Sequence, residues 1–425
     1  MKKPSPRSFF TNLRIDMPWR KRSGFEGWSE MRGSKRVVLV TVMLLLGACA
    51  TSSYAYDFWQ WFKARFSRAS LPALQSGKER FRVEIVTEGL ESPWAITSVP
   101  DGRVFILERP GRMRLFRDGQ IDSSLIKGVP RVAYEGQGGL LDMALHPQYE
   151  RNSFVYLAYT VNTEGGMMTR VARFRDTPQG LTEPKVIFPG VLGGDKAKHF
   201  GSRLRFGIDG KLYITLGERG EGRRAQDLMD LNGKTLRLND DGSIPSDNLF
   251  VGRADARSEI FSYGHRNSQG MAIQPGTGFI FQTEHGPSWN DAPGGGDEVN
   301  IVEAVKNYGW PVIHHLATKE GMISPLLEYT PAVAPAGAMF YTGHAFPSWK
   351  GNLFFTALVG HSLFRIELDG GNVLGQEVLL RDQYGRLRDV AQGPDGLIYV
   401  ITSDTDAYGP GREGGDRLLR LIPVQ

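Results

Sequence analysis

The stretch RFGIDGKLYITLGE, residues 205–218, decides the fold. It joins an Asp-Gly turn to a run rich in β-branched and aromatic residues, which is the pattern of a β-hairpin. The same pattern recurs in SVPDGRVFILE at 98–108, ALHPQYERNSFVYLAY at 144–159, AIQPGTGFIFQTE at 272–284, FPSWKGNLFFTAL at 346–358 and AQGPDGLIYVITSD at 391–404. The six turns are separated by about 45 to 73 residues. The chain therefore contains six copies of one β-rich unit.

Units of this size are typical of propeller blades that carry insertions. Several copies are followed at once by a second alternating run, such as GRMRLFRDG at 111–119 and DRLLRLIPV at 416–424. Residues 81–425 provide about 57 residues for each of six blades. We predict an all-β fold, a six-bladed β-propeller over 81–425. A β-sandwich with additional strands is the alternative, because the spacing is unequal. In a propeller the chemistry should lie on loops that meet at the axial channel.

Composition agrees with frequent turns and limits the possible partners. The chain has 52 Gly and 24 Pro in 425 residues, together above the usual share of about 12%. Its formal charge is +5, but residues 1–36 hold ten basic and three acidic residues, a net of +7, which leaves −2 for the rest. The body therefore lacks the positive surface that a nucleic-acid-binding protein needs, and we expect no nucleic-acid partner.

The first fifty residues resemble an export leader. Fourteen uncharged residues, VVLVTVMLLLGACA at 37–50, follow a basic stretch and are too few to span a bilayer comfortably. The only cysteine, Cys49, ends a lipobox-like Leu-Gly-Ala-Cys sequence, so we predict a lipid-anchored protein at the periplasmic side of the outer membrane. A plain signal peptide cleaved after Ala50 or Ala55 is the alternative. With a single cysteine the mature chain has no internal disulfide.

Residues 51–80 form a predicted connector with many aromatic residues. Phe58, Phe62 and Phe66 recur every four residues among basic side chains. This spacing is typical of a short amphipathic helix at a lipid interface. The alternative is a segment that packs on the main domain.

Two loop motifs, one with a histidine and one with an arginine, are the first candidates for a catalytic or binding site. His199 stands just before a strand, where a neutral imidazole could take a proton from a bound alcohol. A surface or hydrogen-bonding histidine is the alternative. The motif 264–267, Gly-His-Arg-Asn, interrupts an apolar strand, and Arg266 there offers paired donors to an anion. It could equally tie loops together through main-chain carbonyls.

Two further clusters point to a cation and an anion. Residues 282–311 combine small residues, turn carbonyls and carboxylates, which suit a hard cation such as Ca²⁺, although the spacing is not that of an EF-hand. Arg386 and Arg388 lie two residues apart and so on one face of a strand, where they repel unless an anion or water lies between them. An exposed edge strand is the alternative.

Taken together, these motifs resemble the soluble, quinone-dependent aldose (glucose/sorbosone) dehydrogenases, which are six-bladed propellers that use pyrroloquinoline quinone (PQQ) and Ca²⁺. The resemblance rests on the order of several motifs: SPWAI at 92–96, EGQGGLLDMALHP at 135–147, HFGSRLRFG at 199–207, GKTLRLNDDGSIPSDN at 233–248, GHRNSQG at 264–270, DEVNIVEAVKNYGWP at 297–311 and RLRDV at 386–390. It implies oxidation of an aldose at C1 to an aldonolactone, with hydride passing to the quinone and electrons to an external acceptor.

The resemblance also assigns roles. It implies that His199 is the catalytic base, assisted by Arg266, and that Gln137 contacts the substrate. For the cofactor it implies Asn267, Arg386 and Arg388, to which we add Arg219 as a predicted contact from this chain's own sequence. For Ca²⁺ it implies the carbonyls of Gly286 and Pro287, with Glu298 and Tyr308 at a second calcium position. PQQ is a tricarboxylate, so several arginines and a hard cation suit it.

The sequence departs from the family pattern at two positions. Val359 stands where members can carry a cofactor-binding lysine, which puts cofactor affinity in question. Arg219 stands where the glucose-oxidising branch has an amide, so it could contact an anion or narrow the sugar pocket. Two other functions stay open: a calcium-dependent lactonase, and a propeller that binds a partner without catalysis.

Overall fold

The computed structural model describes residues 78–194, 196–288, 291, 293–406, 408–411 and 413–424. The predicted leader lies outside the described residues, as does all of the connector except residues 78–80. Export, lipid anchoring and the periplasmic location therefore stay predictions. No helix within the described ranges is long and apolar enough to cross a membrane.

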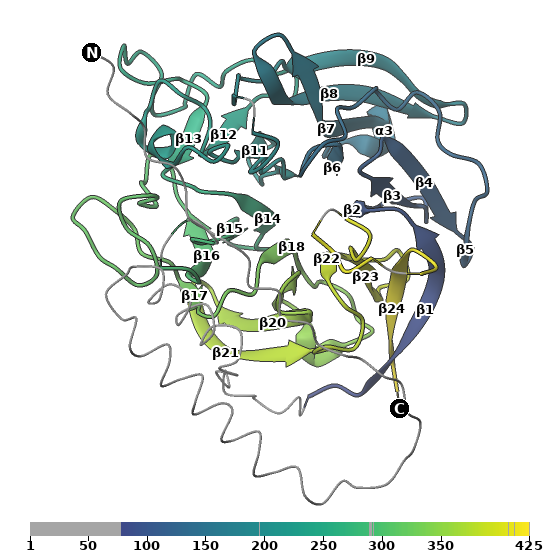
Figure 1. Ribbon diagram of the computed structural model, residues 1–425. Helices are drawn as coiled ribbons and strands as arrows, with labels where there is room; N and C mark the ends of the chain where they lie inside the picture. The colour runs from purple at the N-terminus through teal and green to yellow at the C-terminus, as the bar shows by residue number, and fades with distance from the viewer. Residues whose placement is uncertain are drawn as a thin grey trace, which may run out of the picture. The chain divides into compact units, whose positions relative to one another are not determined.

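The described residues form six four-stranded antiparallel sheets arranged as a ring around an axis (Figure 1). Blade 1 contains β2 (Pro93–Ser98), β3 (Val104–Glu108), β4 (Arg112–Arg117) and β5 (Gln120–Ile121). Blade 2 contains β6 (Leu140–Leu145), β7 (Phe154–Thr163), β8 (Gly166–Thr177) and β9 (Gly180–Phe188). Blade 3 contains β10 (Leu204–Phe206), β11 (Leu212–Leu216), β12 (Lys234–Leu238) and β13 (Ile260–Tyr263).

The remaining blades have the same order. Blade 4 contains β14 (Ser268–Ile273), β15 (Ile280–Glu284), β16 (Asp297–Val302) and β17 (Leu327–Tyr329). Blade 5 contains β18 (Pro335–Phe340), β19 (Leu353–Ala357), β20 (Ser362–Asp369) and β21 (Asn372–Leu379). Blade 6 contains β22 (Leu387–Gln392), β23 (Ile398–Thr402), β24 (Asp416–Pro423) and β1 (Phe81–Leu90). The described helices are short: α3 (Tyr149–Asn152), and the 3₁₀ turns η1 (Gly222–Gln226) and η2 (Pro347–Trp349).

The six-bladed prediction is confirmed, and the sandwich alternative is wrong. Each of the six predicted turns joins the first and second strand of one blade. The inner strands β2, β6, β10, β14, β18 and β22 contact one another in a closed circle. Closure comes from β1, which pairs with β24 from Phe81↔Pro423 to Leu90↔Asp416 and so completes the last blade with the first described strand. A ring closed in this way leaves only short, protected sheet edges.

Apolar layers between blades and one buried arginine hold the ring together. Separate clusters of buried apolar side chains fill the spaces between neighbouring sheets. At the axis, the fully buried Arg203 pairs with Asp142 of β6 and Asp389 of β22, at 3.2 Å each, and its Nε donates to the carbonyl of Gln269 in β14. Its guanidinium also lies 4.0 Å from the ring centre of Trp94 in β2. One side chain thus connects the inner strands of four other blades.

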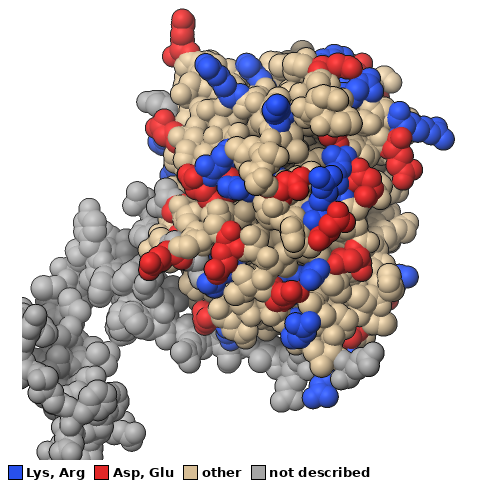
Figure 2. Space-filling view, turned by 90° about the vertical axis from the view of Figure 1, so that its right-hand side faces the viewer, with Lys and Arg blue, Asp and Glu red and all other residues tan. Residues whose placement is uncertain are grey.

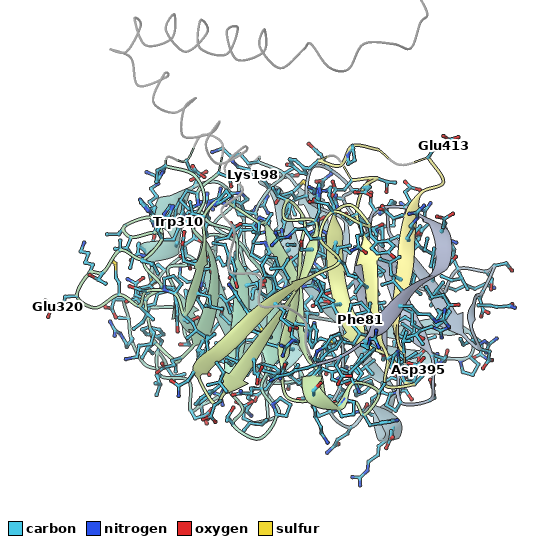
Figure 3. The ribbon with its side chains drawn as sticks, turned by 90° about the horizontal axis from the view of Figure 1, so that it is seen from below. Phe81, Lys198, Trp310, Glu320, Asp395 and Glu413 are labelled. Atoms are coloured by element: carbon cyan, nitrogen blue, oxygen red, sulfur yellow. The ribbon has the colours of Figure 1, made fainter. Side chains whose placement is uncertain are left out.

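Antiparallel blades place alternate loops on opposite faces of the ring. Lys198, in the loop before β10, and Trp310, in the loop after β16, lie toward one face, whereas Asp395, in the turn between β22 and β23, lies toward the other (Figure 3). We call the face that bears Lys198 and Trp310 the upper face. On the side of the molecule in Figure 2, basic and acidic side chains are interspersed, with no large patch of one sign.

Candidate active site

Loops that enter three inner strands carry the main predicted residues. His199 precedes β10, Arg266 and Asn267 precede β14, and Arg386 immediately precedes β22. Inner strands run beside the axis, so the loops that lead into them converge there. All four side chains are buried, with 8% exposure or less. Arg386 is one residue outside its strand, yet it and Arg388 within β22 both contact Asp406, as expected for positions two apart.

His199 is held in a defined orientation by two contacts. Its backbone has φ +54°, a left-handed conformation that is uncommon for a non-glycine residue, and its main-chain N–H donates to Gln137 Oε1 at 2.8 Å. The carbonyl of His199 packs so closely against Gly217 that a methyl group there would lie 2.1 Å away. Strain of this kind persists only where the surroundings enforce it, which is common at functional sites.

Glu218 is the partner of the His199 imidazole. Its Oε1 lies 2.7 Å from Nδ1, and both side chains are buried. A carboxylate at this distance fixes the proton on Nδ1 and leaves Nε2 with a lone pair. Burial lowers the pKa of His199, assisted by the charge of Arg266 and opposed by the bond to Glu218. Burial alone would raise the pKa of Glu218, but the bond from His199 and the charge of Arg266 hold it below its usual value. The pair therefore presents a neutral base.

Arg266 is fixed by acidic residues on two sides. Its main-chain N–H donates to Glu284, and its guanidinium pairs with Asp291, with Nη2 at 2.7 Å from Oδ2. The guanidinium also lies 5.3 Å from the ring centre of Trp310. The neighbouring Asn267 accepts from the main-chain N–H of Gly201 at 3.2 Å, whereas its Nδ2 is buried without a hydrogen-bond partner. Within the described part of the chain, the Arg266 guanidinium reaches one main-chain carbonyl, that of His285, at the long distance of 3.4 Å.

Arg386 and Arg388 share one counter-ion, Asp406. The Oδ2 atom of Asp406 lies 3.3 Å from Nη2 of Arg386 and 3.1 Å from Nη2 of Arg388. Ser403 Oγ and the main-chain N–H of Tyr408 also donate to this carboxylate, each at 2.9 Å. Burial would raise the pKa of Asp406, but the two guanidinium groups lower it to about 2. The two arginines are therefore buried side by side and are not on an exposed edge.

These residues form one site. The main-chain N–H of Glu218 donates to the Arg266 carbonyl at 2.9 Å, and the N–H of His285 donates to the Asn267 carbonyl at 3.2 Å. The charges of Arg266 and Arg388 also act on the imidazole of His285. Burial is the main cause that lowers the pKa of Arg388 to about 10. The charge of Arg109 lowers this pKa further, so Arg109 also belongs to the region. Arg388 Nε, like Asn267 Nδ2, is a buried donor without a partner. An unpaired buried donor is costly, so this donor-rich site is suited to an anion.

Arg219 is part of the same loop system but faces the protein. Its Nε donates to the Lys198 carbonyl at 2.9 Å and Nη1 to the Met167 carbonyl at 3.3 Å, with a further bond to Lys196. The guanidinium stacks over Phe200, 3.6 Å from the ring centre. Burial lowers its pKa to about 9. Arg219 therefore shapes the loop that carries His199, and its predicted contact with the cofactor stays a prediction.

The predicted calcium residues divide into two places. Gly286 and Pro287 follow β15 and are buried beside Asp297, whose carboxylate accepts the Gly286 N–H at 2.8 Å. Glu298 lies on β16 opposite Glu284, and Asn300 donates to it at 2.8 Å. The Tyr308 hydroxyl donates to the Ile301 carbonyl and accepts from the Glu303 N–H, so a ligand role for Tyr308 would need its carbonyl. Within the described ranges, no group of three or more His, Cys, Asp or Glu side chains gathers for a metal.

The structure adds residues that sequence reasoning missed. They are Glu218, Asp291 and Asp406, which pair with predicted residues, and His285, which lies among them. Glu218 is directly before Arg219 in a loop that the sequence had already marked. Val359 is the other position at which the sequence departs from the family pattern. It follows β19 and is 57% exposed, so an exposed apolar side chain stands where family members can carry a lysine.

Comparison with known proteins decides the family. The glucose/sorbosone dehydrogenase family model matches residues 90–409. The chain belongs to this family. It is 36% identical to the aldose sugar dehydrogenase of Escherichia coli, over 78% of this chain and 93% of that protein. It is 27% identical to quinoprotein glucose dehydrogenase B of Acinetobacter calcoaceticus, over 77% and 86% of the two chains. The PQQ-bound aldose sugar dehydrogenase of Streptomyces coelicolor superposes with a TM-score of 0.69, at 30% identity, over 81% and 99% of the two chains. Family membership supports an oxidoreductase that acts on sugars.

Proposed function

We propose that the protein oxidises an aldose at C1 to the aldonolactone, with PQQ and Ca²⁺ bound at this site and His199 as the general base. The observation that carries the proposal is a carboxylate-oriented imidazole joined by hydrogen bonds of neighbouring loops to a set of buried arginines. Relatives that are named for sugar oxidation, and one structure with bound PQQ, support the substrate class and the cofactor.

The free donors of the site fit a polyanionic cofactor. Arg388 Nε and Asn267 Nδ2 are buried and unpaired, and an incoming carboxylate or carbonyl oxygen would satisfy them. Arg386 and Arg388 would hold carboxylates of PQQ, while Arg266 and Asn267 would lie at its reacting edge. Asp406 and Asp291 already orient three of these side chains, so little side-chain entropy would be lost on binding.

Carbonyl oxygens beside the site fit a hard cation. We propose that the carbonyls of Gly286 and Pro287 hold Ca²⁺ together with the cofactor. A methyl group on Gly286 would lie 2.2 Å from the Gly296 carbonyl oxygen and 2.4 Å from that of Gly295, so only glycine fits and several carbonyls gather in this loop. Among the described residues, the Gly286 carbonyl accepts one hydrogen bond, from the Ser288 hydroxyl at 3.2 Å, and this hydroxyl can rotate away.

The chemistry divides between the bound group and the protein. PQQ, when bound, supplies the quinone carbon that accepts the hydride from C1 of the sugar. His199 Nε2 removes the proton of the anomeric hydroxyl, and Glu218 stabilises the imidazolium that results. Gln137, which is tied to the His199 main chain through Oε1, has its amide N–H groups available for the sugar. Burial of the base excludes water from the proton transfer.

Reconstitution tests the function. Purified protein is loaded with PQQ and Ca²⁺ and supplied with an aldose panel and an artificial dye acceptor. We expect dye reduction and lactone formation in the wild type, and loss of turnover with preserved PQQ binding in His199→Ala. Near-normal turnover in His199→Ala would refute the base assignment. Lactone hydrolysis without PQQ would instead favour the lactonase, and inactivity with all sugars would favour the binding module.

A further inference from the structure

His285 is a second imidazole in the site, and its role is not accounted for by the chemistry above. It directly follows β15, and its main-chain N–H donates to the Asn267 carbonyl at 3.2 Å. Its own carbonyl accepts from Arg266 Nη1 at 3.4 Å. The guanidinium groups of Arg266 and Arg388 lie close enough for their charges to act on its ring. His285 therefore lies among the residues proposed to bind PQQ and the sugar.

One hydrogen bond determines which ring nitrogen of His285 carries the proton. Nε2 lies 2.9 Å from the main-chain carbonyl oxygen of Pro335, at the start of β18. A carbonyl can only accept, so Nε2 is the N–H of the neutral ring and Nδ1 carries the lone pair.

Nδ1 is open to a ligand. It makes no hydrogen bond to any residue that the structure describes, and it is not among the buried unpaired atoms there, in contrast to Arg388 Nε and Asn267 Nδ2. Arg388 Nε and Asn267 Nδ2, the other site atoms without a partner, are both donors. His199 Nε2 is an acceptor, but in the proposed mechanism it takes the proton of the reacting hydroxyl. Nδ1 of His285 is thus a second, fixed acceptor in a site that otherwise offers donors.

We propose that His285 is a ligand-positioning residue whose Nδ1 accepts a hydrogen bond from an uncharged O–H or N–H group of the bound molecule. This inference rests on the proposed function, because it assigns a contact within the same site. Two sources have the required chemistry: a hydroxyl of the sugar that does not react, and the pyrrole N–H of PQQ. In both cases His285 recognises a donor, whereas the arginines recognise anions, so the two kinds of group select for different parts of the ligand.

Two substitutions separate the two nitrogens. The oxygen of an asparagine side chain lies near the position of Nδ1, so His285→Asn keeps an acceptor there and loses the bond to Pro335. The amide of a glutamine reaches the position of Nε2, so His285→Gln keeps a donor to Pro335 and loses the acceptor at Nδ1. We expect His285→Gln to weaken binding by roughly 5- to 100-fold and His285→Asn to remain within about threefold of the wild type.

The first arm measures PQQ binding to the apoprotein with Ca²⁺ and no sugar, by calorimetry. The second measures KM for aldoses and their monodeoxy analogues in the reconstituted enzyme. Weaker PQQ binding in His285→Gln identifies the cofactor N–H. Unchanged PQQ binding with a raised KM identifies a sugar hydroxyl, and the deoxy analogue that lacks it should be insensitive to the substitution. Equal behaviour of both variants in both arms would overturn the inference.

A spectroscopic readout covers variants that fail to fold. In wild-type protein with ¹⁵N-labelled histidine, the resonances of His285 should report an Nε2–H tautomer, and its Nδ1 signal should shift on addition of PQQ or sugar. An Nδ1 signal that does not respond to PQQ with Ca²⁺ or to the sugar would contradict the inference. If wild-type protein binds PQQ but oxidises no aldose, the proposed function fails, and the binding arm still tests His285.

Discussion

Glu218→Gln is the most direct test of how the site creates a base. The carboxylate lies 2.7 Å from His199 Nδ1, and the two side chains are only 2% and 7% exposed. Glutamine has almost the same shape but no charge. Its amide can donate to Nδ1, which forces the ring proton onto Nε2 and removes the lone pair that the mechanism needs. If its oxygen accepts instead, the imidazolium formed during the reaction loses its counter-charge.

The expected size follows from these two effects. A positioned general base contributes about 10²- to 10⁴-fold, so we expect kcat to fall by this factor, which corresponds to about 2.7 to 5.5 kcal/mol in activation free energy. The bond to Glu218 raises the pKa of His199 against burial. Its loss lowers that pKa further, so the acid limb of the kcat/KM profile of any residual activity should move to lower pH.

Steady-state dye reduction across a pH series measures both quantities, and calorimetric PQQ binding separates chemistry from cofactor loss. Glu221→Gln is a matched control, because Glu221 lies on the same loop but pairs with Arg224 at 3.1 Å. It should retain wild-type kcat. A Glu218→Gln enzyme that keeps more than about a third of kcat with an unshifted profile would show that Glu218 does not orient the base.

Three further changes test the cofactor pocket. Arg388→Ala should weaken PQQ binding by at least tenfold in calorimetry, because it removes a buried donor in contact with Gln269 and Asp406, and unchanged affinity would exclude Arg388 from the pocket. Asp406→Asn should lower the free energy of unfolding at pH 7 by about 2 kcal/mol, because the pKa of the Asp406 carboxyl is about 2 in the folded protein and 3.8 in the unfolded chain. That contribution is present above pH 4 and disappears as pH falls toward 2, so the variant should lose less stability than the wild type over this range in denaturant melts. Chelation of Ca²⁺ should abolish dye reduction, and addition of Ca²⁺ should restore it; full activity in excess chelator would argue against the Gly286 and Pro287 carbonyl site.

The fold could be predicted from the sequence because its determinants are local. Each blade begins with a hairpin whose turn residues and strand periodicity lie within about fifteen residues, as in 205–218. The strand that completes blade 6 could not be predicted from such local patterns. The pairing of β1 with β24 joins segments more than 300 residues apart, and no local pattern specifies it.

The site could be predicted only in part, because the partners of its residues are set by strand register. Glu218 reaches His199 across the hairpin in which Leu204 pairs with Ile214. Asp406 reaches Arg388 because β23 runs antiparallel to β22, which brings the loop after Thr402 back to the start of β22. From the sequence, Arg219 could contact an anion or narrow the sugar pocket, and both interpretations stay predictions. Its guanidinium donates to three main-chain carbonyls, two of them in the loop that carries His199, and no local pattern specifies these contacts.

The same arrangement explains how a buried cluster of arginines can exist before any anionic cofactor arrives. Isolated guanidinium groups cannot be buried without large cost, yet here each has partial compensation from a carboxylate or from main-chain carbonyls. The hydrogen bonding of Arg388 is incomplete: its Nη1 and Nη2 atoms have partners, but its buried Nε has none. This free donor can contribute to ligand binding. Affinity for the cofactor should therefore come from donors that are already oriented and dehydrated, and less from a long-range positive field, which agrees with the near-neutral body of the chain.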